Sequence, residues 1–259
     1  MNRGTLEGEK YEKDFCIRFN RRDPSIDSSC LDLDIKDTYA VHVIGHKYSQ
    51  NTQRNVKPKS DAFLVNLSQN DFADICKEEF YINEKSFVDN NIQFIKNSGI
   101  SIKNKDSKSF QWYKFTFDSF LKTFEDKFLF IGIQTFTRSN AIFKNESLLE
   151  NFGLSKEEYF EHFQKFLYLD GCDETKYKEI DKHCKDFIER EIKKNDSIRE
   201  LVFSGKGVFE DPFYASYFFQ DDVLKPMNPE EYEFYLTTGS GRTKAKKTGD
   251  YTVVVKPSS

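Results

Sequence analysis

The sequence predicts a mixed α/β protein, in which a mixed central sheet is flanked by helices. One observation is that residues 1–136 alternate an amphipathic helix, three strand-like runs, a short helix and a further apolar run. The second is that the rest of the chain holds two helical stretches followed by short strand-like runs between Gly, Pro and acidic turns. The change of character places a domain boundary near residue 140, giving parts 1–140 and 141–259, which can also form one continuous domain.

The first part contains six expected elements. Leu6, Tyr11, Phe15 and Phe19 recur among charges at helical spacing, and the later runs are β-branched or aromatic and bounded by Gly, Pro or polar turns. The elements are a helix over 6–20, strands over 38–45, 61–67 and 98–103, a helix over 118–126 and a strand over 128–136.

The second part begins with helices and ends with strands. An apolar stripe that includes Tyr177, Ile180, Cys184 and Ile188 predicts one long helix. The expected helices cover 156–169 and 175–194, and the expected strands lie in 199–205, 213–219, 231–236 and 250–256.

The cysteines and the length of the apolar runs indicate the cellular compartment of the protein. Its five cysteines are odd in number and include no CxxC pair, which predicts reduced thiols and a cytoplasmic protein. No apolar run approaches the roughly 18 residues of a membrane span, so we expect no membrane association.

Charge is distributed unevenly over the 259 residues. The formal net charge is −4, yet residues 43–59 carry four cations and no acid, and residues 96–114 and 239–259 each carry five cations against one acid. Solvated loops can produce one such cluster, but three on an otherwise acidic body suit a protein with one anion-binding face. A nucleic acid is a partner of this kind.

Two polar residues interrupt the strand pattern. Asp61 begins an apolar strand, and Lys103 follows Ile100 and Ile102 on a strand whose alternation turns it away from them. If these strands pair, the carboxylate can hold a hard divalent cation while the lysine activates a water beside a phosphodiester. Glu9 and Glu12, which share one face of the first helix, are candidates for a further ligand.

The combination resembles the PD-(D/E)xK nuclease superfamily, in particular type II restriction endonucleases. The counterparts are "GEKYE" at 8–12, "PKSD" at 58–61 and "SIK" at 101–103, and the resemblance covers residues 1–136. It implies a restriction-endonuclease-like αβββαβ core and Mg²⁺-dependent hydrolysis of phosphodiester bonds in double-stranded DNA at a short specific sequence.

The resemblance also implies roles for individual residues. Asp61 and the Ile102 carbonyl would ligate Mg²⁺, for which Mn²⁺ is the expected substitute, and Lys103 would position or deprotonate the attacking water. Ser101 occupies the place of the second acidic residue, so Glu12 or Glu9, with Glu125 as a more distant candidate, would complete the metal shell.

The basic segments supply the expected DNA contacts, and residues 141–259 would form the recognition and dimerisation half. A homodimer suits a palindromic site, and a DNA methyltransferase is the expected genetic partner. A repair or structure-specific nuclease of the same fold, or a non-catalytic DNA-binding protein, are the alternatives. The contact residues are Lys57, Lys59, Lys105, Lys108, Gln111, Arg242, Lys244, Lys246 and Lys247.

Overall fold

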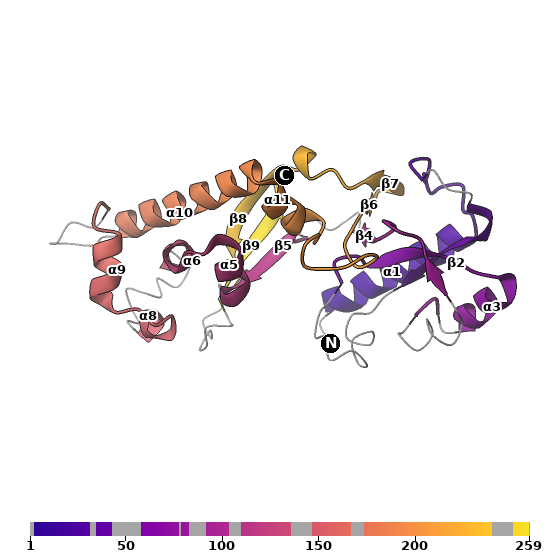
Figure 1. Cartoon of the computed structure of the whole chain (residues 1–259), viewed down its shortest axis with the longest axis horizontal. Helices are drawn as coiled ribbons and strands as arrows, with labels where there is room; N and C mark the ends of the chain where they lie inside the picture. Colours follow the sequence, from indigo (N-terminus) through magenta and orange to yellow (C-terminus); the bar gives the residue numbers. More distant parts are fainter. Residues whose placement is uncertain are drawn as a thin grey trace. The chain divides into compact units, whose positions relative to one another are not determined.

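The chain divides into two compact units, each described here by itself (Figure 1). Unit 1 comprises Met1–Lys108 and Phe203–Pro229, and unit 2 comprises Ser109–Val202 and Glu230–Ser259. This division does not follow the expected boundary near residue 140, because a late strand pairs with an early one and returns the chain to unit 1. The computed structural model describes residues 3–31, 35–42, 58–77, 79–82, 92–103, 110–135, 147–166, 174–239 and 251–258.

Unit 1 is built on a mixed sheet. The strand order is β1-β2-β4-β6-β7, with β3 also paired to β2; every pairing is antiparallel except that of β4 with β6. The expected mixed sheet is therefore confirmed. The elements are α1 (Arg3–Asn20), η1 (Ile35–Asp37), β1 (Thr38–His42), β2 (Ala62–Asn66), α3 (Gln69–Lys77), β3 (Gln93–Phe94), β4 (Ile100–Ile102), β6 (Tyr217–Gln220) and β7 (Val223–Pro226).

Each face of this sheet carries its own apolar core, as the alternation of side chains requires. On one face, Phe15, Cys16 and Phe19 of α1 pack with Ala40, Leu64, Ile100, Ile102 and Phe219. On the other, Ile75 of α3 packs with Tyr39, Val41, Phe63 and Val65. Helices thus flank the sheet, which confirms the predicted α/β class.

Unit 2 has a three-stranded antiparallel sheet in the order β5-β9-β8, with helices beside it (Figure 1). Ser155 and Glu158 form a capping box that begins α9 and fixes where this helix starts. The elements are β5 (Tyr113–Thr116), α5 (Phe117–Phe124), α6 (Lys127–Thr135), α8 (Ser147–Asn151), α9 (Lys156–His162), α10 (Glu174–Lys194), α11 (Asp196–Phe203), η2 (Pro229–Glu231), β8 (Phe234–Thr238) and β9 (Thr252–Pro257).

The strand expected over 128–136 is wrong, because this segment forms helix α6. A continuous apolar run is compatible with a strand buried on both faces and with a helix buried all round. Residues 129–135 are all buried. The packing is tight enough that a Cβ built on Gly132 would lie 2.4 Å from Sγ of Cys184 on α10.

The strand expected over 199–205 is also wrong. The helix α11 begins at Asp196, where Oδ1 of Asn195 accepts hydrogen bonds from the amides of Ser197 and Ile198. This cap satisfies two amides that lack partners within the helix and sets its start before the apolar run. The run of seven residues at 199–205 was too short for its periodicity to show the helix.

Among the described residues, no helix combines the length and apolar character needed to cross a membrane.

Candidate active site

Asp61 and Lys103 meet at the end of two paired strands. Nζ of Lys103 lies 3.2 Å from Oδ2 of Asp61 and 3.1 Å from the carbonyl oxygen of Ile102. The same Oδ2 accepts a 2.7 Å hydrogen bond from the Ile102 amide. The side chains of Asp61 and Lys103 are 23% and 19% exposed, so solvent reaches both. The predicted proximity of these two residues is confirmed.

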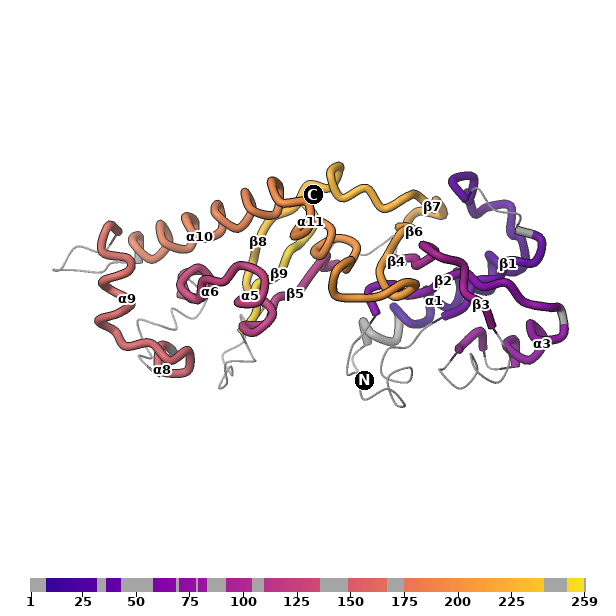
Figure 2. The backbone as a smooth tube through the Cα atoms, in the orientation of Figure 1, coloured from indigo at the N-terminus to yellow at the C-terminus, as the bar shows by residue number. Residues whose placement is uncertain are grey.

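The strand pairing explains this geometry. Ala62 of β2 pairs with Ile100 of β4, and the Asp61 amide donates to the Ile100 carbonyl at 2.8 Å. On the other side of β4, the Lys103 amide donates to the carbonyl of Phe219 at 2.9 Å, continuing the parallel pairing with β6 (Figure 2). The backbones of both residues are therefore held by neighbouring strands.

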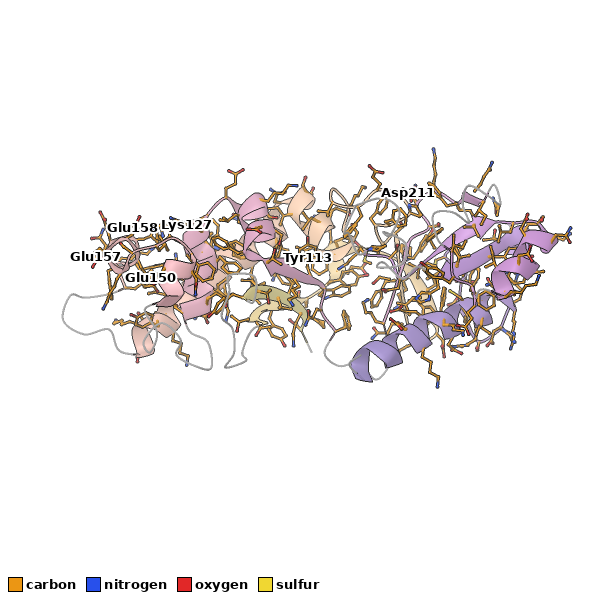
Figure 3. The ribbon with its side chains drawn as sticks, turned by 90° about the horizontal axis from the view of Figure 1, so that it is seen from below. Tyr113, Lys127, Glu150, Glu157, Glu158 and Asp211 are labelled. Carbon is orange, nitrogen blue, oxygen red and sulfur yellow. The ribbon has the colours of Figure 1, made fainter. Side chains whose placement is uncertain are left out.

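The segment before β6 braces the start of β4. Gly99 is needed there, since a Cβ at this position would lie 1.9 Å from the carbonyl oxygen of Tyr214 and 2.5 Å from that of Pro212. Ser60 Oγ also donates to the Pro212 carbonyl, at 2.9 Å. Asp211, labelled in Figure 3, accepts from the amide of Asn97. Chain segments far apart in the sequence thus fix the strand that leads to Lys103.

Glu12 approaches from α1, paired with a histidine. Its Oε2 lies 2.7 Å from Nε2 of His42, the last residue of β1. Burial raises the pKa of the Glu12 carboxyl; the hydrogen bond with His42 lowers it and the charge of Asp61 raises it further. The charge of Lys103 also acts on Glu12. Glu12 therefore belongs to the electrostatic environment of Asp61 and Lys103.

Lys59 is a second lysine in this environment. The residue as a whole is partly exposed, but its ammonium is buried, and this burial together with the charge of Lys103 lowers the pKa of Lys59 to about 7. The charge of Asp61 opposes the shift. Gly205, with φ of +80°, leaves room for the aliphatic part of the Lys59 side chain, because a Cβ on Gly205 would lie 2.8 Å from Cβ of Lys59.

The donor set suits Mg²⁺ with few protein ligands. Asp61 Oδ2 and the Ile102 carbonyl both accept from the Lys103 ammonium, so an ion bound to these two oxygens would take over the position that the ammonium fills and displace it to the side. Mg²⁺ is commonly held by one or two carboxylates and keeps several waters. Among the described residues there is no group of three His, Cys, Asp or Glu side chains that could hold a metal. The available oxygens fit a hydrated ion rather than one enclosed by protein.

The remaining predicted site residues fall in three groups. Ser101 is buried, with Oγ 3.5 Å from Asp61 Oδ2, whereas Glu9 is partly buried on α1. Glu125 and Gln111 belong to unit 2, where Gln111 is exposed. Outside the described residues lie Lys57, Lys105, Lys108, Arg242, Lys244, Lys246 and Lys247.

The contact between His42 and Glu12 was missed by sequence reasoning, which gave His42 no role in the site. The position of His42 next to Asp61 could in part have been predicted from the sequence. His42 ends β1 at the register position opposite Ala62, beside Asp61. Only the packing of α1 on this strand, however, brings Glu12 to the ring.

No protein-family model matches this chain, and no curated protein matches it significantly in sequence.

Proposed function

We propose that this protein is a Mg²⁺-dependent endonuclease of the PD-(D/E)xK type that hydrolyses double-stranded DNA, as type II restriction endonucleases do. The observation that carries the proposal is the meeting of Asp61 and Lys103 on paired strands, next to a backbone carbonyl that faces the same position. A carboxylate, a carbonyl and an ammonium at one partly exposed strand end are suited to phosphodiester hydrolysis.

The topology supports the same reading. In chain order, unit 1 has helix α1, strands β1 and β2, the excursion α3 and β3, strand β4, and then β6, which runs parallel to β4. Helix α11, which precedes β6, lies in unit 2 except for its last residue, Phe203. Under the proposal, α1, β1, β2, β4 and β6 would be the counterparts of the first helix and the four strands of an αβββαβ core, and α11 would be its second helix. The fourth strand of such a core would then be β6 in place of the expected 128–136.

Each residue has a role in the proposed reaction. Asp61 and the Ile102 carbonyl, with Glu12, would hold the ion, which when bound neutralises charge on the phosphate and acidifies water. Lys103, beside the ion, would orient the attacking water and stabilise the negative charge that develops on the phosphate oxygens. The basic segments would position the duplex through its phosphates.

The substitution at Ser101 favours one second candidate function. A site that lacks the strand's second carboxylate is also what a DNA-binding protein without nuclease activity would retain. Under that alternative the protein shifts duplex DNA in a gel and leaves it intact with Mg²⁺ present. A repair nuclease of the same fold is distinguished by nicking that depends on a mismatch or a branch.

Incubation of plasmid DNA with the protein and Mg²⁺ tests the proposal. We expect discrete fragments that vanish with EDTA and return with Mn²⁺, and their pattern identifies a fixed recognition sequence. Lys103→Ala and Asp61→Ala should stop cutting, whereas Lys77→Ala, which changes an exposed lysine on α3, should not. Analytical ultracentrifugation tests the proposed homodimer, and the neighbouring genes test the proposed methyltransferase partner.

A further inference from the structure

His42 is held by its backbone more firmly than a strand end requires. Its amide donates to the carbonyl of Phe80 at 2.8 Å, and its own carbonyl accepts from the amide of Ile82 at 3.4 Å. Its side chain is 5% exposed. The imidazole therefore has little freedom to move relative to β1.

Glu12 needs a partner of this kind. It projects from a helix on a flexible side chain, and ordering such a side chain costs conformational entropy. The 2.7 Å contact with Nε2 of His42 fixes Oε2, while Asp61 and Lys103 lie close enough for their charges to act on the carboxyl. Of the predicted ligand carboxylates, Glu12 is the one whose rotamer a buried ring restrains.

We propose that His42 is the positioning residue of the candidate active site, and that it holds Glu12 as the second carboxylate in place of the acid missing at Ser101. The inference rests on the proposed function for the identity of the ion. His42 acts through Glu12, as hydrogen-bond partners of metal ligands generally do; losing such a partner typically weakens metal binding about 10- to 100-fold.

Binding of Mn²⁺ alone, followed by electron paramagnetic resonance without DNA, tests this role. We expect His42→Leu to weaken Mn²⁺ binding about 10-fold or more. His42→Gln, which keeps an N–H near the position of Nε2, should lie between wild type and the leucine variant. The control His162→Leu changes an exposed histidine of unit 2 and should bind as wild type.

Two further variants separate positioning from a general structural effect. In a Glu12→Gln background, His42→Leu should cause no additional loss, because the two side chains act as one. Ser101→Asp should restore binding to His42→Leu, because it returns a carboxylate to β4. Thermal unfolding followed by circular dichroism checks each fold, and His42→Asn, too short to reach Glu12, replaces the leucine variant if that one does not fold.

The outcomes are distinguishable. Wild-type Mn²⁺ affinity in a folded His42→Leu or His42→Asn protein, or equal losses with and without Glu12, overturns the role of His42 and leaves the nuclease proposal standing. Wild-type protein that binds Mn²⁺ through Glu12 and His42 but cuts no DNA overturns the nuclease proposal alone. Wild-type protein that binds no Mn²⁺ overturns both.

Discussion

Nζ of Lys103 lies 3.2 Å from Oδ2 of Asp61, across a pair of antiparallel strands. In the proposed reaction, Lys103 orients the attacking water and stabilises the negative charge that develops on the phosphate in the transition state. Lys103→Met should therefore lower the rate of DNA cleavage by about 10²–10⁴-fold. Duplex binding, measured by fluorescence anisotropy in EDTA, should change little. The comparison variant is Lys77→Met, which removes an exposed lysine and should cleave normally. Cleavage by Lys103→Met at the wild-type rate contradicts the assigned role.

Gly99→Ala should destabilise unit 1. The new methyl group would meet the carbonyl oxygens of Tyr214 and Pro212, which belong to backbone and cannot rotate away. We expect the free energy of unfolding to fall by about 1–3 kcal/mol or more in urea titrations. Gly8→Ala, within α1, meets only Oε1 of Glu12 at 3.9 Å and should stabilise by roughly 0.5–1 kcal/mol. Equal effects of the two changes would refute the close packing at Gly99.

Glu12→Gln should lower the proposed nuclease activity and raise the free energy of unfolding. Because the pKa of Glu12 is raised, the folded state keeps a proton that the unfolded chain has released. The free energy of unfolding of the wild type therefore falls as pH rises through the window above the ordinary glutamate value. In EDTA at about pH 8 the variant should be more stable by on the order of 1 kcal/mol, and the gain should vanish below about pH 4. A gain that does not vary with pH contradicts this explanation.

The effect of Lys59→Met on the free energy of unfolding should have the opposite pH dependence to that of Glu12→Gln: the gain should be largest at low pH. With a folded-state pKa of about 7 against the ordinary 10.5, the unfolded chain binds the proton more tightly between these values. The wild type should gain stability as pH rises across that window and carry a penalty below it. Urea titrations of the methionine variant should show higher stability near pH 6, by on the order of 1–3 kcal/mol, and a flatter profile up to about pH 10. A wild-type profile already flat above about pH 7 rules out the buried ammonium.

Gly132→Ala tests the packing of α6 against α10. The added methyl would lie 2.4 Å from Sγ of Cys184, and 3.1–3.2 Å from side-chain atoms of Phe163 and Ile180. We expect a loss of about 1–3 kcal/mol in thermal or urea unfolding. Removing the sulfur in Gly132→Ala/Cys184→Ala should recover part of it, so the two changes should be non-additive. Strict additivity would mean that the two helices do not touch at this point.

The sequence predicted the candidate site better than it predicted the architecture around it. The helix that carries Glu12 and the strands ending at Asp61 and Lys103 have local patterns, an amphipathic stripe or a short alternation, that leave little ambiguity. The apolar segment 128–136 was misread because burial on every side removes the periodicity that separates helix from strand. The role of β6 depends on a partner more than a hundred positions away, which no local pattern encodes.

The parallel pairing of β4 with β6 has a consequence for biosynthesis. A ribosome adding roughly 5–20 residues per second reaches Tyr217 about 6–23 s after Ile102. During that interval the amide of Lys103 lacks the Phe219 carbonyl that later accepts its hydrogen bond. The nascent polypeptide thus emerges with its lysine-bearing strand unfinished, and any activity of that strand end is postponed until the first segment of unit 2, Ser109–Val202, and strand β6 have been translated.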